Sequence, residues 1–160
     1  MSEYEELIGR LFRALNDLDY ETAGALYRDD AVFSDPVFPE LHGEEVRMMW
    51  RMLLEFSDSL SMKVSNIRVD GNAATADWEA SYLYGKEKRP VLNRVKARFE
   101  FKDGGIFRHT DSFSLPRWIS MAHGWGKGAA ALLPPARDKV RAEAKKALDL
   151  YTRRMSRKKK

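Results

Sequence analysis

Residues 73–102 read A-A-T-A-D-W-E-A-S-Y-L-Y-G-K-E-K-R-P-V-L-N-R-V-K-A-R-F-E-F-K. On each side of the charged loop at 85–89, most alternate positions are apolar and most positions between them are polar or charged. A period of two is typical of strands that bury one face and expose the other. The stretch therefore predicts two long antiparallel strands with an apolar inner face and a charged outer face.

The two faces can be written out from the alternation. The predicted inner face comprises Ala74, Ala76, Trp78, Ala80, Tyr82, Tyr84, Val91, Asn93, Val95, Ala97, Phe99 and Phe101. The outer sheet face comprises Asp77, Glu79, Arg94, Lys96, Arg98, Glu100 and Lys102. Mixed charges of this kind can pair across a symmetric contact, so we expect a homodimer through the outer sheet face.

Two further strands flank this pair. Asp70-Gly71-Asn72 is a hairpin turn that follows a strand beginning near Ser61, with a bulge expected near Asn66. Asp103-Gly104-Gly105 is the next turn. The last strand is predicted to place five residues on the inner face: Phe107, His109, Asp111, Phe113 and Leu115.

Helical spacing dominates the chain before these strands. Ser2 and Glu5 form a capping box that predicts a helix over 3–17, and Asp19 is the expected N-cap of a second helix. A short strand is expected at 31–33, and a third helix at 43–56. Helices followed by hairpin-linked strands predict an α+β fold, with N-terminal helices packed on a curved antiparallel sheet and a pocket between them.

The C-terminal part has a different composition. After a short helical turn from Pro116, residues 123–135 are predicted to form a Gly/Pro-rich connector, and 136–160 a basic helix and tail. We therefore divide the chain into a domain at 1–122, the connector and the basic C-terminal segment. Residues 137–160 hold 11 Lys or Arg against 3 Asp or Glu, although the whole chain is only +4. The tail can contact nucleic acid or an anionic membrane, but we expect a solvated helix end.

Length and composition exclude several classes of protein. The chain has 160 residues, 44% of them apolar, which is enough for one ordinary globular domain. It has no cysteine, so disulfides, thiolate catalysis and Cys-based metal sites are excluded. The charged residues after Met1 do not resemble a signal peptide, and no stretch is apolar enough to span a membrane. We expect a cytoplasmic protein.

Asp35 is the first candidate catalytic residue. It precedes Pro36 and lies among Phe33, Val37 and Phe38. Burial in apolar surroundings raises the pKa of a carboxyl group, which suits a general acid or base near neutral pH. An Asp-Pro dipeptide is also a common start of a turn, so a structural role stays open.

His109 and Asp111 are the other candidate catalytic residues. The period of two places both on the inner face of the last strand, close enough for a direct contact or a shared water. An aspartate beside a histidine can select the imidazole tautomer or hold a nucleophilic water. A polar pair that only closes the core is the alternative.

A substrate pocket is predicted from inward-facing side chains. Its expected lining is Trp50, Trp78, Tyr82, Asn93, Phe99 and Phe113. Each of these residues can equally belong to the core. The chain lacks H-E-x-x-H, a Walker loop and a G-x-G-x-x-G motif after a strand, so we expect no metal and no cofactor.

Several motifs resemble one superfamily across residues 4–122. They are A-L-N-D-L-D at 14–19, L-Y-R-D-D-A-V-F-S-D-P at 26–36, H-G at 42–43, F-E-F-K-D-G-G-I at 99–106 and H-T-D-S-F at 109–113. Together they resemble the nuclear transport factor 2-like superfamily, in its SnoaL-like and ketosteroid isomerase-like branch. The resemblance implies a cone in which three helices close a bent sheet around a ligand cavity, often as a dimer.

The resemblance also implies roles for single residues. Asp35 stands where ketosteroid isomerases have their proton-shuttling base, but Leu11 and Ala97 stand where those enzymes have the Tyr and Asp of an oxyanion hole. Asp111 stands where SnoaL-like cyclases and limonene epoxide hydrolase-like enzymes have a carboxylate. The Arg-x-Asp of the hydrolases is replaced by Asp77-Trp78-Glu79.

Three functions follow in order of preference. The first is a small-molecule enzyme performing isomerase, cyclase or hydratase-like acid–base chemistry on a hydrophobic substrate. The second is a non-catalytic binding protein for such a molecule, and the third is a dimeric interaction domain.

Overall fold

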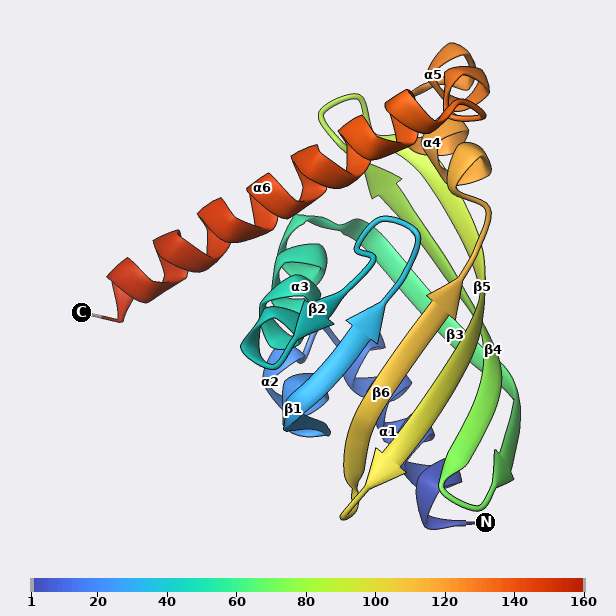
Figure 1. Ribbon diagram of the computed structural model, residues 1–160, viewed down its shortest axis with the longest axis vertical. Helices are drawn as coiled ribbons and strands as arrows, with labels where there is room; N and C mark the ends of the chain where they lie inside the picture. Colours follow the sequence, from blue (N-terminus) through green and yellow to red (C-terminus); the bar gives the residue numbers. More distant parts are fainter. Residues whose placement is uncertain (1, 160) are drawn as a thin grey trace.

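The computed structural model describes residues 2–159, and Figure 1 shows how its helices and strands are arranged. The helices are α1 (Glu3–Asn16), α2 (Tyr20–Ala25), α3 (Glu44–Phe56), α4 (Leu115–His123), α5 (Trp125–Ala130) and α6 (Pro134–Lys158). The strands are β1 (Tyr27–Ser34), β2 (Leu41–His42), β3 (Asp58–Asp70), β4 (Ala73–Tyr84), β5 (Arg89–Lys102) and β6 (Gly105–Ser112). The predicted α+β class is confirmed.

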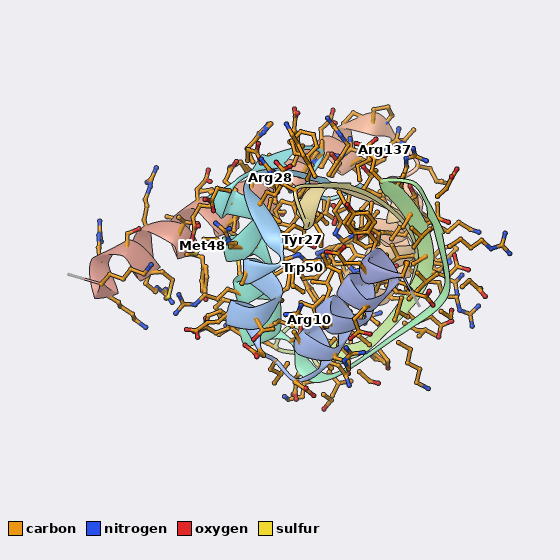
Figure 2. The ribbon with its side chains drawn as sticks, turned by 90° about the horizontal axis from the view of Figure 1, so that it is seen from below. Arg10, Tyr27, Arg28, Met48, Trp50 and Arg137 are labelled. Carbon is orange, nitrogen blue, oxygen red and sulfur yellow. The ribbon has the colours of Figure 1, made fainter. Side chains whose placement is uncertain are left out.

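All six strands form one curved, unclosed sheet in the order β2-β1-β6-β5-β4-β3. Its neighbours are antiparallel except β1 and β6, which run parallel with Phe33 beside His109. The predicted alternation of β4 and β5 is confirmed, because Trp78 and Val95 face each other across the pair and both are buried. Seen from below, the sheet curls around α1 and the core (Figure 2).

The N-terminal helices fill the concave side of the sheet. The Ser2 Oγ accepts a hydrogen bond from the Glu5 amide at 3.1 Å, and Asp19 Oδ1 accepts one from the Thr22 amide at 3.0 Å. Both predicted caps are therefore present. Apolar residues at helical spacing, including Ile8, Leu11 and Leu15 on α1, are fully buried against the sheet.

Two of the register irregularities in the sheet bear on the predicted faces. One lies in β3 between Ser65 and Arg68, with Asn66 at a φ of 52°, as predicted. The other was not predicted: Phe101 pairs with Ile106 and Glu100 with Arg108, so Phe107 is the extra residue. Ile106 is therefore buried where we expected Phe107, and the prediction for Phe107 is wrong. A bulge changes the parity of a strand, and the faces on its two sides no longer follow one alternation.

The C-terminal segment is more ordered than the sequence indicated. The predicted connector at 123–135 contains α5, and α6 begins at Pro134. Gly128 of α5 approaches Ser120 of α4 so closely that no side chain would fit between them, which explains why a glycine-rich stretch packs as a helix. The long α6 then crosses the domain beside α3 (Figure 1). Within residues 2–159, no helix is both long and apolar enough to cross a membrane.

Candidate functional site

A largely apolar cavity of about 300 Å³ lies between α3, the inner face of the sheet and α6. Its walls come from segments that are far apart in the sequence. Its polar lining includes Asp35, Tyr82, Asn93 and Asp111, and its apolar lining includes Phe33, Phe38, Met49, Trp50, Leu54, Trp78, Phe113, Trp118, Ala144 and Ala147. An apolar cavity with a few convergent polar groups is the usual form of a small-molecule site.

Asp111 is the buried carboxylate of this cavity. It lies on β6 and is only 3% exposed. Its Oδ1 accepts one hydrogen bond from Trp78 Nε1 at 3.1 Å and one from His109 Nε2 at 2.8 Å. Neither bond uses Oδ2, which leaves that oxygen available to a molecule in the cavity. Two fixed donors on one oxygen hold the carboxylate in a single orientation.

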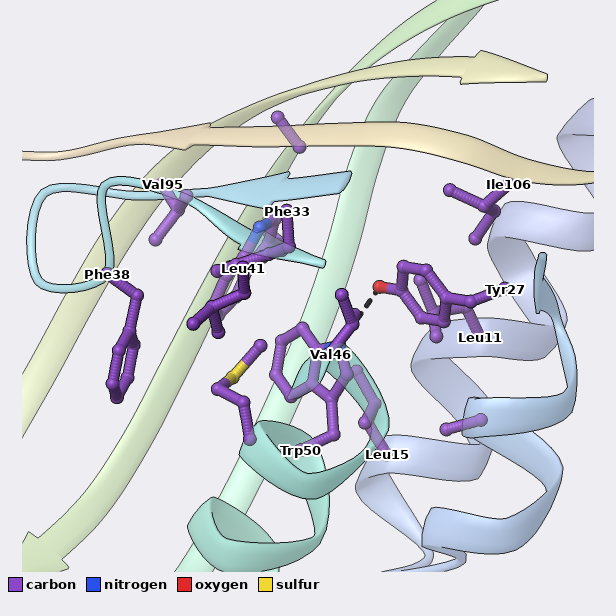
Figure 3. Packing of buried hydrophobic residues seen from close by; sticks show 14 of the residues in the cluster. Leu11, Leu15, Tyr27, Phe33, Phe38, Leu41, Val46, Trp50, Val95 and Ile106 are labelled. Carbon is purple, nitrogen blue, oxygen red and sulfur yellow. Dashed lines mark hydrogen bonds between the residues drawn. The ribbon is translucent and has the colours of Figure 1, made fainter. Parts of the chain in front are cut away.

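A chain of hydrogen bonds behind Asp111 fixes the histidine. Trp50 Nε1 donates to the Tyr27 hydroxyl at 3.0 Å, and that hydroxyl lies 2.7 Å from His109 Nδ1 (Figure 3 shows the Trp50–Tyr27 bond). Burial raises the pKa of Tyr27, and the charge of Asp111 raises it further, so the phenol stays protonated and donates. In the tautomer that matches a phenol donor, Nδ1 accepts from Tyr27 and Nε2 donates to Asp111. The two contacts hold the imidazole in one orientation.

His109 does not line the cavity, and this placement corrects the prediction. Its side chain faces inward as expected but is fully buried. The ring centroids of Phe99 and Phe33 lie 4.3 and 5.0 Å from the centroid of the imidazole. These rings fill the space between the sheet and the helices around His109. Phe99 is likewise buried in the core and does not line the cavity. The alternation of one strand predicts that a side chain points inward. Whether that side chain borders the cavity depends on how side chains from all elements pack around it.

Asp35 faces the same cavity from the turn after β1. Its Oδ1 accepts hydrogen bonds from the amides of Val37 at 2.7 Å and Phe38 at 2.6 Å. The residue is thus a turn aspartate that also lines the cavity, so its role in the turn does not keep it from the site. Burial raises the pKa of Asp35 to about 7; the charge of Asp111 adds to the rise, and the two backbone amides and His109 oppose it. Both amide bonds use Oδ1, so Oδ2 is the oxygen free to exchange a proton.

Tyr82 brings a hydroxyl donor to the cavity. Its oxygen accepts a hydrogen bond from Trp118 Nε1 at 2.8 Å. Burial raises the pKa of Tyr82 to about 12, so the phenol keeps its proton near neutral pH. Because Trp118 supplies a donor, the proton of Tyr82 is available to an acceptor inside the cavity.

The sequence of residues 8–109 matches the SnoaL-like domain. This match covers well over half of the chain. The chain belongs to the SnoaL-like domain family. No curated protein is similar enough in sequence to count as a relative.

Solved structures share the fold of this SnoaL-like domain at low sequence identity. An LEH-like epoxide hydrolase from M. tuberculosis is 24% identical, with a TM-score of 0.64 over 83% of this chain and 96% of that one. An NTF2-like protein of unknown function from Burkholderia pseudomallei is 14% identical, with a TM-score of 0.69 over 77% and 99%. A proposed polyketide cyclase from Xanthomonas campestris is 18% identical, with a TM-score of 0.63 over 74% and 96%. These likenesses establish the nuclear transport factor 2-like fold.

The prediction for this SnoaL-like domain omitted part of the cavity wall. Of the expected lining, Trp50, Trp78, Tyr82, Asn93 and Phe113 are in place. Trp118, Ala144 and Ala147 were missed. Trp118 lies in the predicted helical turn after Pro116, and the two alanines follow the region that resembles the family. The C-terminal helix has a narrow apolar stripe of Val140, Ala144, Ala147, Leu148 and Tyr151, and this stripe is the signal that α6 packs on the domain. Within residues 2–159, no group of three or more His, Asp or Glu side chains is placed to hold a metal ion.

Proposed function

We propose that this SnoaL-like domain is a small-molecule enzyme that performs acid–base chemistry on a largely apolar substrate in the cavity. One observation carries the proposal: two carboxyl groups face one apolar cavity, and their surroundings differ. Asp111 is oriented by two donors, whereas Asp35 has a pKa raised to about 7. Titratable pairs in unlike surroundings are the usual basis of separate acid and base roles.

The two carboxyl groups divide the proton transfers. Asp111 Oδ2 accepts a proton from a substrate carbon or from a water, while His109 and Trp78 keep Oδ1 in place. Asp35, which exchanges protons near neutral pH, returns a proton to the substrate or relays one between two of its atoms. His109 touches no substrate, so it is a positioning residue and not a third proton carrier as the sequence indicated.

Tyr82 and Asn93 add hydrogen-bond donors to the polar lining. The hydroxyl of Tyr82 can donate to an oxygen on which charge develops, which is the role of an oxyanion-type donor. The rest of the wall is apolar and favours an alicyclic or aromatic substrate. Isomerisation, cyclisation and addition of water to an epoxide all suit this set of groups. The names of the solved structures with this fold, an epoxide hydrolase and a proposed polyketide cyclase, fall in the same range.

The first experiment is a thermal-shift screen with apolar ketones, epoxides and lactones, since a ligand that binds only the folded state raises the Tm. Each hit is then followed for conversion by mass spectrometry. Asp111→Asn and Asp35→Asn should each lower turnover by on the order of 100-fold or more. The matched control is Asp70→Asn, because Asp70 is exposed at the β3–β4 turn.

The pH profile tests the role of Asp35. As the proton donor to the substrate, Asp35 is inactive once it is ionised, so kcat should fall as the pH rises through about 7. Asp35→Asn should remove that inflection from the residual activity. A ligand that binds but is recovered unchanged, with equal affinity in both Asn variants, would leave a binding protein as the function.

A further inference from the structure

The outward side of α6 carries a stripe of four basic residues and one leucine. Five exposed residues of α6 recur at intervals of three, four or seven residues: Lys139, Lys146, Leu150, Arg153 and Arg157. At 100° per residue they share one side of the helix. The opposite side holds the residues that α6 buries against the domain, Leu148, Tyr151 and Met155. We name the outward set the basic stripe.

Within residues 2–159, no described ion pair involves a cation of the basic stripe. The ion pairs that the structure describes along α6 use Arg141, which contacts Asp138, and Lys145, which contacts Glu45 and Asp149. Two of the three acidic residues of α6 are therefore already paired. The segment 123–160 holds 12 Lys or Arg against 3 Asp or Glu. Four of these cations, those of the basic stripe, lie on the side that faces away from the domain.

Large apolar residues are exposed next to the beginning of α6. Trp125 is 81% exposed, Leu132 69% and Leu133 65%, all within nine residues of one another, with Lys127 between them. They lie on α5 and the turn that joins it to α6, at one end of the molecule (Figure 1). We name these three residues the apolar tip. Clustered exposure of this kind marks an interaction surface more often than a solvated one.

We propose that the basic stripe and the apolar tip together dock this domain on an anionic membrane surface. The stripe lies along the headgroups, and the tip enters the interface between headgroups and acyl chains. Trp is favoured at that depth, and Leu gains from leaving water there. The basic stripe presents its cations over about 27 Å of helix, which suits a flat charged surface.

Two other partners fit the surface less well. Nucleic acid would neutralise the cations, but its phosphates provide no apolar surface for Leu132 and Leu133. A second copy of this chain would place one basic stripe against another. An anionic bilayer supplies both the charge and the apolar layer.

The docking surface is tested with vesicles of about 30% phosphatidylglycerol in phosphatidylcholine, compared with pure phosphatidylcholine, at about 0.1 M salt. The full chain should sediment with the anionic vesicles only, and added salt should release it. Its tryptophan emission should shift to the blue, because Trp50 and Trp78 are buried already and Trp125 is exposed. Lipids with brominated chains should quench the shifted emission.

Charge-matched variants separate the stripe from general attraction. Lys146→Gln with Arg153→Gln should weaken vesicle binding about 30-fold, since each basic side chain near an anionic surface contributes about fivefold. Arg10→Gln with Lys63→Gln is the control, because both residues are exposed, and Arg10 lies on α1, away from the projecting end of α6 (Figure 2). Trp125→Ser with Leu133→Ser should abolish the blue shift. Unchanged Tm values would show that the variants are folded.

Several results would overturn the proposal. One is equal sedimentation with both kinds of vesicle, and another is an equal loss in the stripe variant and its control. A third is an unaltered blue shift in the tip variant. Tight binding to a single-stranded oligonucleotide without binding to anionic vesicles would instead assign the stripe to nucleic acid. None of these measurements depends on catalysis in the cavity.

Discussion

Asp35→Asn should stabilise the protein at high pH and leave its stability nearly unchanged at low pH. Asparagine can keep both hydrogen bonds from the amides of Val37 and Phe38, because they use Oδ1 alone. It removes only the ionisation of a carboxyl group whose pKa rises from 3.8 to about 7 on folding. The difference between variant and wild type therefore isolates that ionisation.

The direction of the pH dependence follows from which state, folded or unfolded, binds the Asp35 proton more tightly. Between pH 3.8 and about 7 the folded protein keeps a proton on Asp35 that the unfolded chain releases. Wild-type stability from this group therefore falls as the pH rises through that window and is level above it. At about 1.4 kcal/mol per tenfold change, the advantage of the variant should be about 2 kcal/mol at pH 5, about 3 at pH 6 and about 4 above pH 8.

Urea unfolding followed by tryptophan fluorescence gives this difference without a substrate. Both proteins are titrated between pH 4 and about 8.5, and the two free energies of unfolding are subtracted at each pH, so that groups shared by both cancel. A difference that stays within about 1 kcal/mol across the range would refute the burial argument for Asp35. A variant less stable at every pH would mean that Asn fails to keep the two amide bonds.

Three further predictions test other parts of the structure. Tyr27→Phe leaves His109 Nδ1 without its hydrogen-bond partner in a buried site, so it should lower the free energy of unfolding by about 1–3 kcal/mol in urea titrations. The proposed function also predicts a lower kcat with an unchanged KM for this variant. Full activity would contradict the positioning role of His109. Gly128→Ala would place a Cβ 1.6 Å from the Ser120 Oγ, so it should cost about 1–3 kcal/mol, whereas Gly126→Ala, with no atom within 4 Å, is the neutral control. Sedimentation at micromolar concentration should show a dimer through the outer sheet face, and replacing its cations by Glu should yield monomers; a wild-type monomer across that range would exclude this contact.

Local patterns determined much of the fold. The alternation of β4 and β5 alone separates Trp78 from Asp77, because successive side chains of a strand point to opposite faces. The caps at Ser2 and Asp19 are satisfied within three residues, so they too can be identified from neighbouring sequence. The alternation of the last strand likewise placed Asp111 on the inner face. The apolar neighbours of Asp35 in the sequence indicated that its pKa is raised. Each of these features depends on residues close in the chain.

Only the tertiary structure decided how these features combine. The bulge at Phe107 arises from the pairing of two strands, and the parallel contact of β1 with β6 joins segments about 75 residues apart. His109 and Phe99 face inward as predicted, but other side chains pack around them and leave no space. The cavity begins at Asp111, further along the same strand as His109. Tyr27, Trp50 and His109 form one hydrogen-bond chain from three separate elements. Burial, cavity shape and long-range hydrogen bonds depend on which distant side chains meet, and a local period carries no information about that.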